Sequence, residues 1–291
     1  MFGFIRKRPI ISFTLLVFFI TYAIGLPWLF LTQELEQSLG LREELLSLAW
    51  MRAGPTIAGL IVVAIVAGRM GLRTWLSQLL RWRVHPGYYL AIILIVLLPF
   101  LASIAVVPLS TPIAASPDLA HGRDWAAIGW LYLQEIAYIT VTNGEETGWR
   151  FALLGLLLAR MRLFPAVLIV GVIWAAWHGP AFFLFDQASV WFPLIGICLG
   201  WSVLYGWLYL RTGSLLLPVL AHGAANATFY TFERHFPGLS EAYDAYNPMA
   251  DWGFAAFGLA LALVVLTLDR RLFFGPASYR DGEHWAAGAA R

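Results

Sequence analysis

Residues 88–109 read YYLAIILIVLLPFLASIAVVPL, an apolar stretch without a charged side chain. As an α-helix, this stretch is long enough to cross the ~30 Å hydrocarbon core of a bilayer. Seven further segments are predominantly apolar and of similar length or longer, or nearly so, at 10–31, 52–68, 125–160, 164–183, 191–210, 214–232 and 252–272. The sequence therefore predicts an all-α, polytopic membrane helix bundle with about eight transmembrane helices.

The composition supports the same class. Of the 291 residues, 60% are hydrophobic and only 12% are charged, whereas about 25% are charged in an average soluble domain. The spans leave little room for a separate soluble domain, and no internal repeat or low-complexity tract is present. We expect one integral-membrane domain over residues 1–291, embedded in the lipid bilayer, with no nucleic-acid partner.

The basic residues predict how the spans are oriented. If the eight segments alternate in direction, fourteen Lys and Arg residues fall on one side of the membrane and four on the other, with Arg150 left inside a span. By the positive-inside rule, both termini are cytoplasmic. Between the second and third spans, Leu72, Trp75 and Leu79 interleave with Arg73 and Arg81. This pattern is typical of a short amphipathic helix on the cytoplasmic surface, either as a plain linker or as a substrate-docking element.

Two adjacent acids interrupt the fourth apolar segment, in the run GEETGWR at residues 144–150. Charged groups at membrane depth are costly and are usually functional. On a helix, Glu146 and Arg150 are four residues apart, so they share a face and can form an ion pair. Glu145 points about 100° away from that face, so it is less well placed to form an ion pair with Arg150. We therefore expect Glu146 to be committed to Arg150 and Glu145 to be available as a general base acting on water.

Three further polar residues lie in other apolar segments. His178 ends the run WAAWH at residues 174–178, and the Gly-Pro pair that follows is expected to kink or end its helix. His222 and Asn226 are four residues apart and project from one face of another helix. At 1.5 Å per residue, these groups and Glu145 come to similar depths, so we expect them to meet in one cavity. A base, imidazoles and an amide donor are suited to the attack of water on a carbonyl.

Taken singly, each motif also fits a structural role. The acids and Arg150 could form a buried ion-pair cluster that only fixes helix packing. His178 could be a hydrogen-bonded core residue, and His222 with Asn226 an interhelical hydrogen-bonded pair.

Together, the three motifs resemble the CPBP family, which contains the type II CAAX prenyl endopeptidases and bacterial relatives associated with bacteriocin processing or self-immunity. The resemblance rests on Glu-Glu-x-x-x-Arg, an aromatic-x-x-x-His and His-x-x-x-Asn, and it covers residues 125–232. One departure is Trp174, because the second motif of the family usually begins with Phe. The larger side chain is expected to reshape the cavity beside His178 and to affect substrate specificity more than chemistry.

The resemblance implies intramembrane hydrolysis of a peptide bond in a membrane-associated peptide or protein, prenylated or bacteriocin-like. By position in the motifs, Glu145 activates the water, with His178 beside it. His222 and Asn226 stabilise the oxyanion, and the ion pair of Glu146 braces the site. It also implies an integral protein of the cell membrane, in a bacterium the inner membrane.

Two questions stay open at this point. His178 and His222, with Glu145, are candidate ligands for a divalent metal such as zinc, and a metal-free, glutamate-activated water fits equally well. A non-catalytic immunity or scaffold protein, or a proton-coupled transporter that uses the same buried groups as a relay, is the alternative function.

Overall fold

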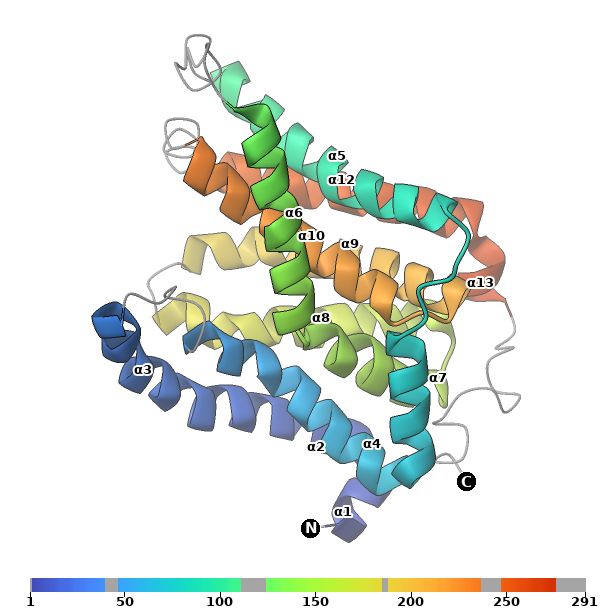
Figure 1. The fold of residues 1–291 in the computed structure, drawn as a ribbon. Helices are drawn as coiled ribbons and strands as arrows, with labels where there is room; N and C mark the ends of the chain where they lie inside the picture. Colours follow the sequence, from blue (N-terminus) through green and yellow to red (C-terminus); the bar gives the residue numbers. More distant parts are fainter. Residues whose placement is uncertain (1, 40–46, 111–123, 185–187, 237–246, 276–291) are drawn as a thin grey trace.

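The computed structural model describes residues 2–39, 47–110, 124–184, 188–236 and 247–275, and these form a bundle of helices (Figure 1). In chain order the helices are α1 (Phe2–Lys7), α2 (Pro9–Phe18), the π-helix η1 (Phe19–Gly25), α3 (Leu26–Leu39), α4 (Ser47–Leu79), α5 (Gly87–Ser110), α6 (Trp125–Thr142), the π-helix η3 (Thr147–Leu154), α7 (Gly155–Leu158), α8 (Leu163–Leu184), α9 (Ala188–Thr212), α10 (Leu216–His235), α12 (Asn247–Leu268) and α13 (Arg270–Phe274). The predicted all-α, polytopic membrane fold is confirmed.

Six of the eight predicted spans are helices long and apolar enough to cross a bilayer. They run over Pro9–Thr32, Arg52–Leu79, Gly87–Ala105, Leu163–Leu184, Ser189–Thr212 and Ala250–Leu268. The seventh predicted span corresponds to α10, which has the length of a span but a more polar sequence. The cytoplasmic location of both termini stays a prediction.

The fourth predicted segment, 125–160, is two helices and not one. The first, α6, ends at Thr142, and Asn143 and Gly144 leave the helical path. A second helix begins at Glu145 and continues through η3 and α7 to Leu158. In Figure 1, α6 (green) runs crosswise to α8, whereas it packs along the length of α10. Asn143 and Glu145 lie where the chain turns, so the acid pair opens a new helix inside the bundle and does not lie mid-span.

The helix from Glu145 to Leu158 lies at the centre of the bundle. Every residue from Thr147 to Leu158 is buried, and α4, α8 and α9 pack against η3. A helix of this length is too short to cross a bilayer. It forms inside the membrane because its broken N-terminus is enclosed by protein, where other groups can satisfy the freed backbone.

Helix α4 bends sharply at Gly68, whose backbone has φ +58°. Glycine adopts this left-handed conformation without the steric cost that a Cβ would add. The segment after the bend turns away from the first half of α4 (Figure 1) and exposes Met70 and Leu76. A helix is therefore present up to Leu79, where the amphipathic helix was predicted, while its place on the cytoplasmic surface stays a prediction. It also reaches the central helix, because Trp75 Nε1 donates to Thr147 Oγ1 at 3.2 Å.

Helix α8 does not end at the Gly-Pro pair after His178, contrary to one of the two outcomes expected from the sequence. It continues through Pro180 to Leu184. Carbonyl groups just before the proline accept bonds from side chains: Trp191 Nε1 donates to the carbonyl of Ala175 at 2.9 Å, and the Tyr22 hydroxyl donates to that of Trp177. These donors satisfy backbone groups around the proline, so the helix can pass it.

Close packing of the central helix on α4 predicts a large effect of substitution at Gly148. A Cβ at this position would lie 2.5 Å from the Pro55 carbonyl oxygen and 2.6 Å from the Pro55 Cβ. We expect Gly148→Val to destabilise the protein by about 1–3 kcal/mol or more, because a rigid backbone cannot move aside. Thermal unfolding in detergent measures the effect. Gly129→Ala is the control, since a Cβ there meets nothing within 4 Å, and an unchanged melting temperature for Gly148→Val would contradict the packing.

Candidate active site

The predicted pair of Glu146 and Arg150 is confirmed, and both residues are fully buried. Arg150 Nη1 donates a hydrogen bond to Glu146 Oε1 at 3.2 Å, and Arg150 Nε lies 3.0 Å from Oε2 as an ion pair without a hydrogen bond. The guanidinium also donates to the Trp201 carbonyl at 3.3 Å and lies 4.6 Å from the ring centroid of Trp174 and 5.1 Å from that of Tyr205. These contacts replace the water that burial removes from the cation.

His222 joins this ion pair. Its Nδ1 lies 2.8 Å from Glu146 Oε1. Because an ionised carboxylate only accepts hydrogen bonds, a neutral His222 carries its proton on Nδ1 and has a lone pair at Nε2. Glu146 therefore orients both Arg150 and His222, which links the first and third sequence motifs directly.

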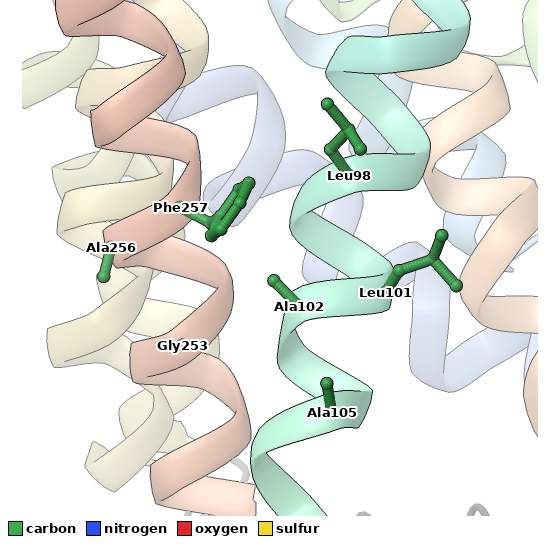
Figure 2. A pocket seen from close by; sticks show the side chains of 7 residues that line it. All are labelled: Leu98, Leu101, Ala102, Ala105, Gly253, Ala256 and Phe257. Atoms are coloured by element: carbon green, nitrogen blue, oxygen red, sulfur yellow. The ribbon is translucent and has the colours of Figure 1, made fainter.

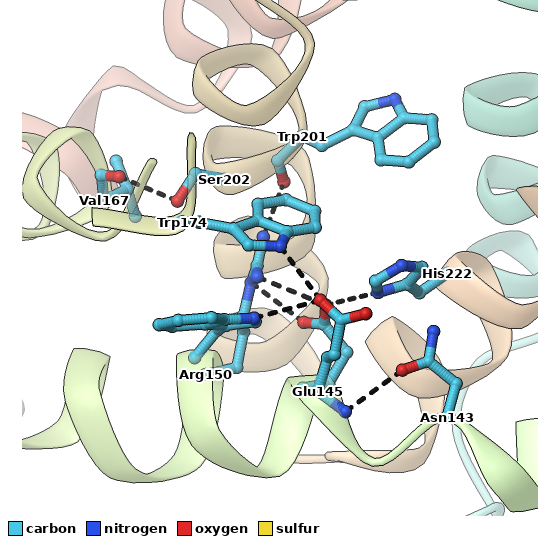
Figure 3. A network of polar contacts seen from close by, with 10 residues as sticks. Asn143, Glu145, Arg150, Val167, Trp174, Trp201, Ser202 and His222 are labelled. Carbon is cyan, nitrogen blue, oxygen red and sulfur yellow. Dashed lines mark hydrogen bonds and ion pairs between the residues drawn. The ribbon is translucent and has the colours of Figure 1, made fainter. Parts of the chain in front are cut away.

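Glu145 is held by different partners. Its Oε2 accepts hydrogen bonds from Trp149 Nε1 at 3.2 Å and from Trp174 Nε1 at 3.0 Å (Figure 3). Its Oε1 has no hydrogen-bond partner among the described residues. The side chain is 5% exposed and makes no ion pair with Arg150. One oxygen is thus fixed by two indoles, while the other is available to a small molecule such as water.

Trp174 contacts Glu145 and both histidines of the site. Besides its bond to Glu145, it packs against both imidazoles, with ring centroids 6.0 Å from His178 and 5.4 Å from His222. Its carbonyl pairs with His178 Nδ1 at 2.9 Å. A carbonyl only accepts, so a neutral His178 also presents a lone pair at Nε2. His178 is half-buried and makes no direct hydrogen bond to Glu145.

Asn143, Trp149 and the donor role of Trp174 were not predicted from the sequence. Asn143 Oδ1 accepts from the backbone N–H of Glu145 at 3.1 Å and caps the central helix. The Asn-Gly pair before the acids was the signal for that cap. Trp149 follows Glu145 by four residues, a spacing that places both on one helix face. The contact of Trp174 joins two helices, and no local pattern indicates it.

Asn226 is half-buried and makes no hydrogen bond to a described residue. It lies one turn after His222 on α10, so the predicted spacing is present, while its role stays a prediction.

The proposed metal ligands do not come together as a metal site. Across residues 2–275, apart from the undescribed segments, no three His, Cys, Asp or Glu side chains are grouped closely enough to hold an ion. His222 Nδ1 is engaged by Glu146, and His178 Nδ1 by a backbone carbonyl, which leaves Nε2 of each ring with its lone pair. A role of these residues as metal ligands stays a prediction, and we derive no step through a metal.

An apolar groove lies elsewhere, between α5 and α12 (Figure 2). Its lining includes Leu98, Leu101, Ala102 and Phe257, and no polar side chain converges on it. A reaction site needs placed polar groups, so this groove is not a second candidate.

The indole of Trp174 predicts a measurable effect. Trp174→Phe restores the residue typical of the family motif but removes one of the two donors to Glu145 Oε2. A hydrogen bond to a charged group contributes about 1.5–3 kcal/mol, so we expect peptide cleavage to slow by roughly tenfold or more while the protein stays folded. Trp191→Phe, which removes an indole donor to the Ala175 carbonyl of the same helix, is the control. Equal activity of Trp174→Phe and wild type would show that this bond does not hold the base.

Comparison with known proteins gives one family. Residues 124–228 match the model of the type II CAAX prenyl endopeptidase Rce1-like family. No curated protein matches the chain. The matched segment contains all six predicted site residues, Glu145, Glu146, Arg150, His178, His222 and Asn226. The match therefore confirms the resemblance of this chain, over residues 124–228, to the CPBP family and its Rce1-like CAAX prenyl endopeptidases.

Proposed function

We propose that this protein is an intramembrane endopeptidase in which Glu145 activates the attacking water. The observation that carries the proposal is the difference between the surroundings of the two oxygens of the Glu145 carboxylate. Two indole donors fix Oε2, and Oε1 accepts no hydrogen bond from a described residue. A buried carboxylate held in one orientation with a single free oxygen is suited to take a proton from a bound water.

The reaction proceeds in two steps. Glu145 Oε1 takes one proton as the water oxygen bonds to the carbon of the scissile peptide, which gives a tetrahedral intermediate with a negative oxygen. The intermediate then collapses, the C–N bond breaks, and Glu145 returns the proton to the leaving nitrogen. The products are a new carboxyl terminus and a new amine, and Glu145 is again ionised.

Glu146, Arg150 and His222 support this chemistry without taking part in the proton transfer. The ion pair fixes the start of the central helix, on which Glu145 lies, and Glu146 holds the ring of His222 through Nδ1. His178 and Trp174 lie on the same helix, α8. The carbonyl of Trp174 pairs with His178 Nδ1, and the indole of Trp174 donates to Glu145, the proposed base. In the neutral state, both imidazoles offer an acceptor at Nε2 for the N–H groups of an extended peptide.

For the substrate we propose a membrane-associated polypeptide, with prenylated Cys-a-a-X peptides as the first class to test, in accord with the name of the matched family. Burial of the site among apolar helices favours a substrate that arrives from the bilayer. In a bacterium, the protein would act in the inner membrane.

The test is a comparison of polypeptide termini. Membranes from cells that express wild type or Glu145→Gln at equal levels are analysed by mass spectrometry of protein N- and C-termini. A protease predicts membrane polypeptides that are shortened only with wild type. Identical termini in both samples, together with an intact farnesylated Cys-a-a-X reporter, would favour the non-catalytic scaffold.

A further inference from the structure

Asn143 has an unused donor beside the base. It lies at the break between α6 and the central helix and is 2% exposed. Its Oδ1 accepts from the Glu145 N–H at 3.1 Å, which fixes the amide orientation, because Nδ2 could not accept that bond. Nδ2 is buried and has no hydrogen-bond partner among the described residues. A buried amide nitrogen without a partner is costly, and such groups in folded proteins call for an explanation.

The direction of this donor is informative. Figure 3 shows Asn143 Nδ2 on the side of the Glu145 carboxylate and His222, while Oδ1 turns down to the backbone of Glu145. The same place lies at the N-terminus of the central helix, whose backbone N–H groups favour negative charge. Broken helices inside membranes use such half-helix N-termini to receive anionic groups.

The proposed reaction needs donors at this place. Its intermediate carries a negative oxygen, and preorganised N–H groups stabilise such an oxygen. His222 in its neutral form has its proton on Nδ1, where Glu146 engages it, so its Nε2 offers a lone pair and no donor. Asn226 is half-buried and is not held by a hydrogen bond to a described residue. Asn143 is the amide that is both buried and fixed.

We propose that Asn143 is a further catalytic residue, whose side-chain amide donates a hydrogen bond from Nδ2 to the oxyanion of the tetrahedral intermediate. The role rests on the proposed endopeptidase function. No bond to Asn143 forms or breaks. The hydrogen bond from Nδ2 strengthens as charge develops on the carbonyl oxygen and weakens again when the C–N bond breaks. The unpaired donor in the free protein is then a preorganised group, placed where the negative charge of the oxyanion develops during the reaction.

Two variants separate this role from helix capping. Asn143→Asp and Asn143→Ser both keep a side-chain oxygen that can accept from the helix N-terminus, and Asp, Ser and Asn are comparable caps. Both lose the amide donor. Asp adds a negative charge beside Glu145, whereas the Ser hydroxyl is uncharged and its side chain is one bond too short to reach the position of Nδ2. A pure capping role therefore predicts normal activity for Asn143→Ser. Asn143→Ala removes the cap as well and serves as the reference for lost stability.

The experiment uses the full-length protein in proteoliposomes and a quenched fluorescent, farnesylated Cys-a-a-X peptide. At equal concentrations of folded protein, we expect Asn143→Asp and Asn143→Ser to lower kcat by about 10²–10³-fold, the typical effect of losing one oxyanion donor. KM should stay within about threefold of wild type, because the interaction forms only in the transition state. The melting temperature of Asn143→Ser should match wild type, with a decrease for Asn143→Ala because the cap is lost and for Asn143→Asp because a charge is buried.

The outcomes are distinguishable. If Asn143→Ser or Asn143→Asp keeps the kcat of wild type while Glu145→Gln is inactive, the proposed protease stands and Asn143 is only a cap. If wild type fails to cleave the peptide, or Glu145→Gln cleaves it as fast as wild type, the proposed function fails, and the role of Asn143 is overturned with it.

Discussion

Glu145→Gln is expected to lower the rate of peptide cleavage by about 10³–10⁴-fold, near the upper end of what a general base contributes. Glutamine keeps the shape of the side chain and can still accept from Trp149 and Trp174 through its amide oxygen. It cannot take a proton from water at the position of Oε1. The measurement is single-turnover cleavage of a confirmed substrate by purified protein, with folding verified by melting temperature.

Glu135→Gln is the matched control for this result. Glu135 is also a buried glutamate, 6% exposed, and it pairs with Arg234 at 2.8 Å on the α6–α10 contact. Its loss tests whether removal of any buried carboxylate impairs the enzyme. We expect Glu135→Gln to cleave at close to the wild-type rate. Equal losses in both variants would mean that Glu145 matters for structure and not for chemistry.

Arg150→Met is expected to give the largest loss of stability. The substitution leaves Glu146 buried, with His222 as its remaining ionisable partner. Breaking a buried ion pair from one side typically costs about 3–5 kcal/mol, because an uncompensated charge stays in the interior. Equilibrium unfolding in mixed detergent micelles measures the free energy of unfolding.

The double variant Glu146→Gln/Arg150→Met completes this experiment. Removing both charges avoids the unpaired carboxylate, so we expect the double variant to be more stable than Arg150→Met alone. A double variant that loses the sum of the two single effects would contradict the pairing. Activity gives a second reading, because His222 loses its carboxylate partner in the double variant, and we expect cleavage to stay impaired although stability recovers.

Sequence alone predicted the helical membrane fold and the ion pair because both depend on local rules. Apolar length predicts spans, and spacing by four residues predicted that Glu146 meets Arg150. The same rule correctly separated Glu145 from the arginine. It also applies to Glu145 and Trp149, whose contact was not predicted.

What the sequence could not supply depends on contacts between helices. The break at Asn143 was hidden because hydropathy continues across it, although the length of segment 125–160 and the Asn-Gly pair were signs of it. The donation from the Trp174 indole to Glu145 was not predicted, and its effect on substrate specificity stays a prediction. The contact of His222 Nδ1 with Glu146 was not predicted either, and the role of His222 at an oxyanion stays a prediction. Each of these facts follows from how α8 and α10 pack around the central helix.

The most direct test of the account is mass spectrometry of the cleavage products formed in oxygen-18 water. Wild type and Glu145→Gln, reconstituted in proteoliposomes at equal amounts, are incubated with the same membrane-associated substrate. The account predicts that wild type yields two fragments, with one oxygen-18 atom in the new carboxyl terminus, and that Glu145→Gln leaves the substrate intact over the same period. Cleavage by Glu145→Gln at the wild-type rate would contradict the central role of Glu145.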